Sequence, residues 1–312
     1  MIQERLKALR AEMEKRGITV YVVPTADFHE SEYVGDHFKT RKFITGFTGS
    51  AGTAVITLDE AGLWTDGRYF VQAENQLKDS TVTLYRMGEE GVPTVDEFVK
   101  DRLKEGGCLG FDGRVVNGTW GGRLEKIAAE KNVSMHVTED LIDLIWEDRP
   151  ALSKQPLFIL EEKYSGKSTA DKIGDLRKAM KENGADVHIL TSLYDIAWLL
   201  NIRGNDIDYV PVVLSYLVLN ETECIWFLQE EVVDDKIRAY LEENHITTKP
   251  YDAIYDYVPE IPADAVVLMN RGTVNYRIVN SLDKAIKVVD KPNPTELMKA
   301  VKNKTEVDRK SV

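Results

Sequence analysis

The alternation of hydrophobic and polar positions along the chain follows the same plan twice. The motif L-R-x-x-M-x-x-x-G-x-x-V begins at Leu9 and begins again at Leu176. In each copy the apolar spacing predicts an amphipathic helix that ends at a glycine, Gly17 or Gly184, which can take the left-handed conformation after a helix. A short apolar strand follows in each copy, at 20–23 and 187–190. The repeat predicts that the chain is a duplication of one structural unit.

Further along each copy, two neighbouring apolar runs are separated by a few polar residues. These runs cover 52–58 with 62–65 and 212–219 with 223–228. We interpret each pair as adjacent strands, and a helix is predicted after each pair, at 69–77 and 232–243. Because helices alternate with short strands, we predict an α/β fold in which each half has a mixed sheet flanked by helices.

The polar, proline-containing stretch 146–156 separates the two copies and is the predicted linker. We therefore expect a first domain at 1–150 and a second domain at 151–292. The segment 293–312 has helix-forming residues after two prolines and is interpreted as the start of a further, truncated domain. The alternative is a C-terminal helix that docks on the second domain.

Composition narrows the classes of partner. The formal net charge is −12, and acidic residues exceed basic ones in both halves, so nucleic acid and anionic membranes are not expected partners. The two cysteines, Cys108 and Cys224, are far apart and indicate neither a disulfide framework nor a cysteine zinc site. The N-terminus is charged and has no apolar signal region. We expect a cytoplasmic protein.

Two glycine-containing motifs resemble known sites but have the wrong spacing. The stretch 46–52 reads G-F-T-G-S-A-G, which is neither a nucleophile elbow around Ser50 nor a dinucleotide fingerprint. We interpret it as a tight loop that leads into a strand, with ligand or interface contact as the alternative.

Gly166-Lys167-Ser168 resembles the end of a phosphate-binding loop but lacks the earlier glycine. Ser168 is therefore interpreted as a helix N-cap completed by Asp171.

One cluster contains possible metal ligands, and its spacing is unlike that of a zinc helix. His29 and His37 are eight positions apart, whereas the H-E-x-x-H motif places two histidines four positions apart on one helical face. Glu30, Glu32 and Asp36 lie near them in the sequence. We predict hydrogen-bonded or exposed roles for this cluster and no metal site.

Two further segments place polar groups beside predicted elements. Asp66 and Arg68 lie between a strand and a helix; Asp66 can cap the helix, and the guanidinium of Arg68 can pair with a ligand carboxylate or a neighbouring domain. In the second copy, Trp198 is expected in the core, whereas Arg203 and Asp206 are candidates for an interdomain surface.

Taken together, the motifs resemble those of three-domain, eukaryotic-type aminopeptidase P, a metal-dependent Xaa-Pro aminopeptidase of the creatinase/prolidase superfamily. The resemblance runs from Leu9 to about Thr305. It is carried by five segments: 27–33, 46–52, 64–70, 195–204 and 293–297. Asp208, Val210 and Glu30 depart from what related sequences commonly show.

The resemblance implies two tandem creatinase N-terminal-like domains followed by a catalytic domain that holds two divalent ions, usually Mn²⁺. None of those metal ligands is expected here, so we predict no catalytic residue, no metal ligand and no activity for this chain alone. The parent enzyme would act on peptides with proline at the second position. This region would shape access to the cleft, contact its own catalytic domain and support a homo-oligomer. The substrate-cleft candidates are His29, Glu32, Tyr33 and Arg68.

Two other hypotheses remain open at the level of the sequence. The chain is alternatively a stand-alone binding or scaffold protein that retains the duplicated fold without catalysis. A third possibility is a hydrolase that uses Ser50 or the cluster of His29 and His37, although the motif spacings oppose it. The coding sequence beyond Val312 distinguishes the first hypothesis from the second.

Overall fold

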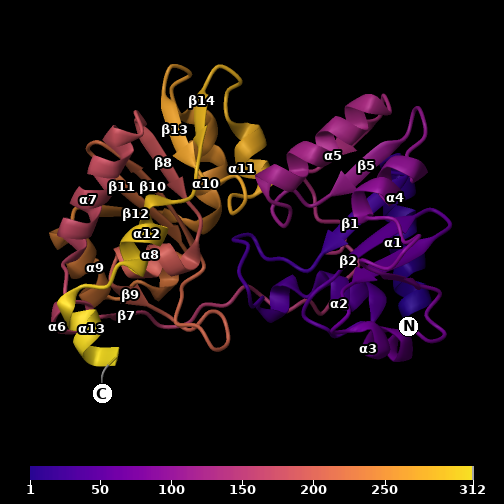
Figure 1. Cartoon of the computed structure of the whole chain (residues 1–312), viewed down its shortest axis with the longest axis horizontal. Helices are drawn as coiled ribbons and strands as arrows, with labels where there is room; N and C mark the ends of the chain where they lie inside the picture. The colour runs from indigo at the N-terminus through magenta and orange to yellow at the C-terminus, as the bar shows by residue number, and fades with distance from the viewer. Residues whose placement is uncertain (311–312) are drawn as a thin grey trace. The chain divides into compact units, whose positions relative to one another are not determined.

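The computed structural model describes residues 1–310, which form two compact units (Figure 1). Unit 1 comprises Met1–Phe28, Glu32–Ala151 and Asn275–Arg277. Unit 2 comprises His29–Ser31, Leu152–Val274 and the chain from Ile278 onward. Each unit therefore contains one short segment that is distant in sequence from the rest of that unit.

Unit 1 is built on a six-stranded mixed sheet with the order β4-β3-β2-β1-β5-β6. β1 pairs antiparallel with β2, and β2 with β3, whereas the remaining neighbours pair in parallel. The strands are β1 (Val20–Pro24), β2 (Thr53–Thr57), β3 (Ala61–Thr65), β4 (Thr83–Arg86), β5 (Cys108–Phe111) and β6 (Ser134–His136).

Helices cover both faces of this sheet. Successive residues of β1 enter different core clusters, since Tyr21 and Val23 pack in one and Val20 and Val22 in the other. A central strand buried on both faces lacks the alternation of a half-exposed strand, which explains its continuous apolar sequence. The helices are α1 (Ile2–Lys15), α2 (Thr40–Thr45), α3 (Phe70–Gln76), α4 (Val95–Arg102) and α5 (Gly118–Glu130), with a 3₁₀ turn at Asp36–Phe38.

Unit 2 repeats the same sheet with the order β12-β11-β10-β8-β13-β14. Its pairings have the same directions as their counterparts in unit 1. The strands are β8 (Val187–Leu190), β10 (Ser215–Asn220), β11 (Cys224–Leu228), β12 (Ile246–Pro250), β13 (Val266–Met269) and β14 (Lys287–Asp290), and β7 (Phe158–Ile159) pairs separately with β9 (Ile202–Arg203). The identical topology confirms the predicted internal duplication and the α/β fold class.

The remaining elements of unit 2 are mainly helical. The helices are α6 (Glu162–Ser165), α7 (Thr169–Glu182), α8 (Leu193–Leu199), α9 (Asp235–Glu243), α10 (Ile254–Tyr257), α11 (Tyr276–Ser281), α12 (Pro294–Ala300) and α13 (Lys304–Lys310), with 3₁₀ turns at Glu230–Val232, Tyr251–Ala253 and Val258–Glu260. α11 begins in the short segment that belongs to unit 1. Within the described chain, no helix is both long and apolar enough to cross a bilayer.

The repeated motif has the same structural role in both units. Its leucine and methionine are buried in each core, at Leu9 and Met13 and again at Leu176 and Met180. Its glycine takes a positive φ, +67° at Gly17 and +62° at Gly184, as the sequence predicts. The motif is therefore repeated because each unit needs the same helix–turn–strand geometry.

Several local predictions are confirmed, and two need correction. Ser168 caps α7 by accepting a hydrogen bond from the backbone N–H of Asp171 at 3.1 Å, as predicted. Asp66 does not cap α3, since no side-chain cap is found at the start of that helix. The helix expected from 232 begins only at Asp235, where Asp234 supplies the cap after a 3₁₀ turn.

The segment after Asn293 forms α12 and α13, which pack on unit 2. Lys299 Nζ lies 2.6 Å from Oδ1 of the buried Asp195, and Asn303 Nδ2 donates to the backbone oxygen of Ser165 at 2.8 Å. These contacts match the alternative of a helix docked on the second domain. That 293–312 also begins a truncated catalytic domain stays a prediction.

Candidate functional site

Arg68 and Asp66 form an exposed ion pair directly after β3. Asp66 Oδ1 accepts hydrogen bonds from the backbone N–H of Arg68 at 3.0 Å and from its Nε at 2.9 Å, while Nη2 donates to Oδ2 at 2.8 Å. The hydrogen bonds from Arg68 lower the pKa of Asp66 to about 2. The Arg68 side chain remains 69% exposed, so the pair is displayed on the surface with its guanidinium already bound to a carboxylate.

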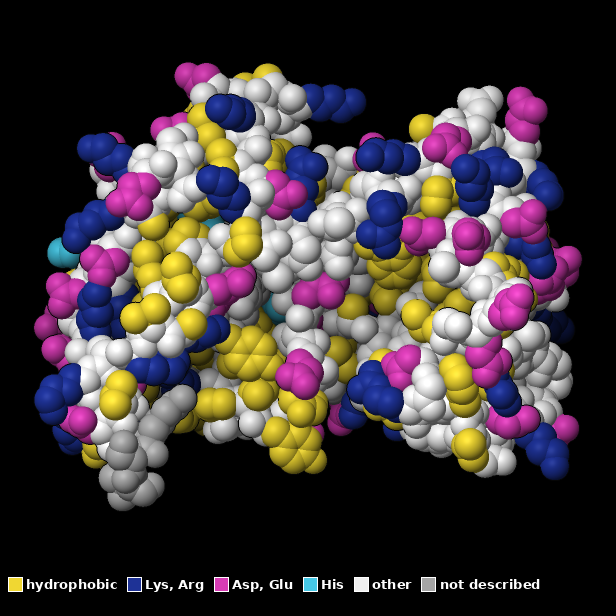
Figure 2. All heavy atoms as spheres, viewed as in Figure 1, with side chains coloured by type: hydrophobic (Ala, Val, Ile, Leu, Met, Phe, Trp, Pro, Cys, Tyr) yellow, Lys and Arg dark blue, Asp and Glu magenta, His cyan; other side chains and the backbone are white. Residues whose placement is uncertain are grey.

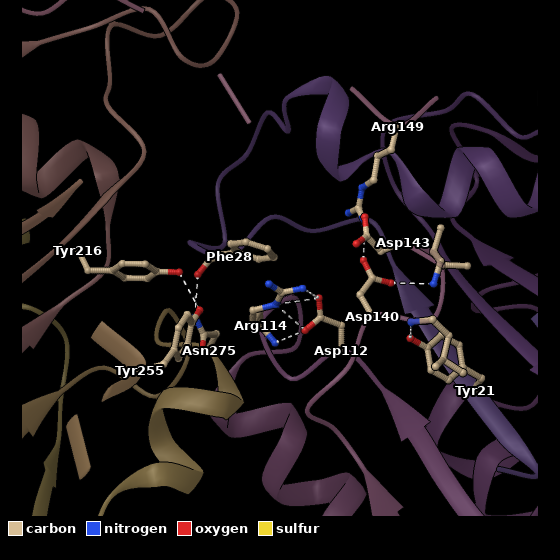
Figure 3. Close-up of polar contacts among 12 residues, drawn as sticks. Tyr21, Phe28, Asp112, Arg114, Asp140, Asp143, Arg149, Tyr216, Tyr255 and Asn275 are labelled. Carbon is tan, nitrogen blue, oxygen red and sulfur yellow. Dashed lines mark hydrogen bonds and ion pairs between the residues drawn. The ribbon is translucent and has the colours of Figure 1, made fainter. Parts of the chain in front are cut away.

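The same arrangement occurs again in unit 1, where the sequence analysis missed it. Asp112 Oδ1 accepts from the backbone N–H of Arg114 at 2.9 Å and from its Nε at 3.0 Å (Figure 3). The signal was present, since the tripeptide Asp-Gly-Arg occurs at both 66–68 and 112–114. Here the carboxylate is 3% exposed, and the Arg114 guanidinium lies 4.5 Å from the ring centroid of Phe28.

A second buried ion pair lies in the same unit. Arg149 Nη1 lies 2.6 Å from Asp140 Oδ2 and 3.1 Å from Asp143 Oδ1 (Figure 3). Burial and the charge of Asp112 raise the pKa of Asp140, and Arg149 opposes this shift. Arg149 Nε also donates to the backbone oxygen of His37 at 3.0 Å. This hydrogen bond ties Arg149 to the 3₁₀ turn that contains His37.

His29 lies inside unit 2 and is only 2% exposed. Its Nε2 lies 2.6 Å from the hydroxyl of Tyr251 and its Nδ1 lies 3.1 Å from the backbone oxygen of Thr191. The ring of Tyr216 is 4.5 Å away, and the Tyr216 hydroxyl lies 2.9 Å from that of Tyr255 (Figure 3). Burial raises the pKa of Tyr216 well above its usual value. His29 therefore belongs to a packed aromatic cluster.

Glu32 and Tyr33 lie on the surface of unit 1. Glu32 is exposed, and the Tyr33 side chain is 44% exposed. Glu32, Tyr33 and Arg68 are thus accessible to solvent on unit 1, whereas His29 is buried in unit 2. Their assignment to a substrate cleft stays a prediction.

The glycine loop 46–52 is held by a buried arginine. Arg41, which is 3% exposed, donates through Nη1 to the Phe47 backbone oxygen at 2.5 Å and through Nη2 to that of Gly49. The Ser50 hydroxyl lies 2.6 Å from the Tyr69 hydroxyl. The bonds from Arg41 account for the conformation of the loop. The partner of Ser50 is a phenol, whereas the serine of a hydrolase needs a base such as histidine.

The remaining sequence candidates have structural partners inside their own unit. Arg203 Nη1 donates to the backbone oxygens of Ala197 and Ile202, and Asp206 accepts from the backbone N–H of Leu214 at 2.9 Å. Trp198 packs partly buried against the core, as expected. Both cysteines are free thiols, and both are buried.

No group of three or more His, Cys, Asp or Glu side chains within residues 1–310 is arranged to hold a metal ion. His29 and His37, the two histidines of the cluster that the sequence offers as possible ligands, have other partners. His29 contacts Tyr251 and Thr191, as described above, and His37 Nδ1 lies 2.8 Å from the Pro150 backbone oxygen. Lys, Arg, Asp and Glu side chains are interspersed over the face shown in Figure 2.

Comparisons with known proteins agree with this architecture. A family model described as the Creatinase/Prolidase N-terminal domain matches residues 5–145, and a second model with the same description matches 148–306. A probable Xaa-Pro aminopeptidase P of Neurospora crassa is 38% identical over 98% of this chain and 46% of its own length. Xaa-Pro aminopeptidase 1 of Dictyostelium discoideum is 33% identical over 98% of this chain and 50% of its own length.

A solved structure shows the same fold throughout. The X-prolyl aminopeptidase of Caenorhabditis elegans, described as a cytosolic enzyme with a di-nuclear active site, matches with a TM-score of 0.92 and 31% identity. The match covers 99% of this chain and 52% of the other. The chain thus spans about half the length of the relatives it matches.

Proposed function

The chain belongs to the creatinase/prolidase family, whose N-terminal domain it contains twice, and from this premise we propose that it is the non-catalytic N-terminal region of a metal-dependent Xaa-Pro aminopeptidase. The observation that carries the proposal is the likeness to the C. elegans X-prolyl aminopeptidase over 99% of this chain but only 52% of that enzyme. The catalytic metal pair, Mn²⁺ in this proposal, is assigned to a part of the parent enzyme outside this chain.

In this proposal the two units shape the approach of peptides to a catalytic cleft and support assembly of the enzyme. The substrates are peptides with proline at the second position, and the site of action is the cytoplasm. Exposed Glu32, Tyr33 and Arg68 are the residues offered to substrate or to the catalytic domain. His29 is buried in unit 2, so its role in this proposal is to anchor its own segment through Thr191 and Tyr251.

The first test is hydrolysis of an Xaa-Pro-Xaa peptide by the purified 312-residue chain with added Mn²⁺, with a chelator as control. The proposal expects no turnover, because a metal-activated water needs a complete set of ligands. Turnover that the chelator abolishes would place a working metal site inside this chain and overturn the assignment of the chemistry to another domain.

A second test addresses access to the cleft in the longer enzyme. Tyr33→Ser and Arg68→Gln are expected to change the ratio of kcat/KM between long and short Xaa-Pro peptides, because the proposed contacts lie away from the bond that is cleaved. Lys236→Gln, an exposed change on α9, is the matched control. An unchanged ratio in both test variants contradicts the role in access. A coding sequence that ends at Val312 would instead support the stand-alone binding protein.

A further inference from the structure

Unit 2 contains a pocket that the proposed function does not use. Its volume is about 250 Å³, and its walls come from α6, α7, β9 and α13 together with the ends of neighbouring elements. Four basic side chains and one acidic side chain line it: Lys172, Arg203, Lys302, Arg309 and Glu306. The pocket therefore has an excess of positive charge in a protein whose net charge is −12, and clefts of one sign concentrate ligands of the opposite sign.

Lys172 forms the floor of this pocket. The residue is 2% exposed, and its Nζ donates to the Trp198 backbone oxygen at 2.7 Å and to Asn201 Oδ1 at 2.6 Å. The ammonium also lies 4.3 Å from the ring centroid of Trp198. Burial lowers its pKa to about 8; the charge of Arg203 adds to this shift, and the charge of Glu306 opposes it. A buried ammonium with only neutral hydrogen-bond acceptors is stabilised by a nearby anion.

No ion pair joins the four basic side chains of the pocket to a carboxylate within residues 1–310. The single acid, Glu306, is engaged at the start of α13, where Oε2 accepts from the backbone N–H of Asn303 at 3.0 Å. Arg309 lies 4.3 Å from the ring centroid of Tyr164, at the rim. The basic charge of the pocket is thus only partly balanced by the described protein.

Hydrogen bonds hold the inner wall of the pocket in place. Asn201 takes a positive φ of +51°, and its Nδ2 donates to the Lys167 backbone oxygen at 2.9 Å while its Oδ1 holds Lys172. Asn303 fixes the opposite side by donating to Ser165. Groups held in place in this way lose little conformational entropy on binding, which favours affinity.

We propose that this pocket binds a small phosphate-bearing anion, with Lys172 and Arg203 as its inner ligands and Lys302 and Arg309 at its rim. Several cations around one cavity suit a multivalent oxyanion better than a single carboxylate. The volume equals that of roughly eight waters, which accommodates a phosphate group with a small substituent or a pyrophosphate.

The test is isothermal titration of the 312-residue chain with inorganic phosphate, pyrophosphate and glycerol phosphate in a buffer free of other oxyanions. We expect saturable one-to-one binding that weakens with added KCl. A preference for glycerol phosphate over the inorganic ions would identify a phosphorylated metabolite as the source, and the reverse preference a free ion. The absence of saturable binding for all three ions at millimolar concentration overturns the proposal.

Variants show whether the pocket is the binding site. Arg203→Gln is expected to weaken binding roughly tenfold, the usual effect of losing one charged hydrogen bond, and Lys172→Met to remove binding. Lys178→Gln, on the exposed face of the same helix, should leave the affinity unchanged. If Lys172→Met does not fold, Arg203→Gln and Lys302→Gln decide the question. Equal affinity in the wild type and in these two variants places the anion elsewhere and refutes the site.

Discussion

Arg149 Nη1 lies 2.6 Å from Asp140 Oδ2, and the two side chains are each only 6% exposed. The same guanidinium reaches Asp143, whose side chain is 63% exposed, at 3.1 Å. One arginine thus makes a buried and an exposed ion pair, and the energetic difference between the two can be measured within one local structure.

Arg149→Met is expected to lower the free energy of unfolding by about 3–5 kcal/mol, because it leaves the Asp140 carboxylate buried without its partner. Asp143→Asn removes only the exposed pair and should cost less than about 1 kcal/mol. Urea unfolding of both variants provides the measurement. Equal losses in the two variants would show that burial does not govern this network.

Adjacent glycines of α5 make a matched pair. A Cβ added at Gly121 would lie 2.1 Å from Tyr276 Cδ2, whereas a Cβ at Gly122 meets nothing within 4 Å. We expect Gly121→Ala to destabilise unit 1 by about 1–3 kcal/mol through displacement of the buried tyrosine ring. Gly122→Ala should stabilise it by up to about 1 kcal/mol, since alanine favours helix. Thermal unfolding should therefore separate the two variants in opposite directions.

The lowered pKa of Lys172 predicts how the free energy of unfolding depends on pH when no phosphate is present. Its pKa falls from an ordinary 10.5 to about 8 on folding. Between these values the unfolded chain holds a proton that the folded chain has released, so the free energy of unfolding rises with pH in that window. The rise is about 3 kcal/mol for a shift of this size.

The measurement compares wild type with Lys172→Met from about pH 7 to about pH 11. The difference in unfolding free energy between the two proteins should change by that amount and then level off, whereas Lys178→Gln should follow the wild type. A constant difference across the whole range would mean that the Lys172 pKa is not lowered by folding.

The repeated arginine motif gives a prediction for both units. Arg10 Nε donates to the Thr57 backbone oxygen at 2.9 Å, and Arg177 Nε donates to that of Asn220 at 3.0 Å. Each bond ties the first helix of the repeat to the end of the second strand. Arg10→Met and Arg177→Met should each lower the free energy of unfolding by about 1 kcal/mol, with additive losses in the double variant. Urea titrations that show no loss for either variant contradict this shared role.

The sequence predicted the architecture because the repeated features are local. A helix spacing, a glycine and a following strand can be recognised in one short window, and they recur at Leu9 and Leu176. The order of the six strands could not be predicted, since it depends on pairing between segments far apart in the chain. For the same reason, the sequence could not predict that Asn275–Arg277 belongs to unit 1.

Buried charge was the main feature that the sequence concealed. Arg41 and Lys172 are charged residues that would be expected at the surface, yet they are 3% and 2% exposed. Arg41 is bound by backbone oxygens of the loop 46–52, whereas Lys172 is bound by the Trp198 backbone oxygen near the end of α8 and by the Asn201 side chain. Neither set of partners is marked by the hydrophobic pattern around the charged residue. His29 was singled out as a polar residue, and its partners Thr191 and Tyr251 lie far away in the sequence.

The two sheets differ where their parallel central strands meet. Tyr21 lies opposite Gly110 in unit 1, and a Cβ at that glycine would be 2.7 Å from the tyrosine ring, whereas the equivalent pair in unit 2 is His188 opposite Leu268. If β1 entered the sheet of unit 2 during folding, a large ring would meet a leucine. Leu268 fills the space that the Tyr21 ring needs, so this pair of positions disfavours entry of β1 into the second sheet and helps each copy of the fold to select its own strand.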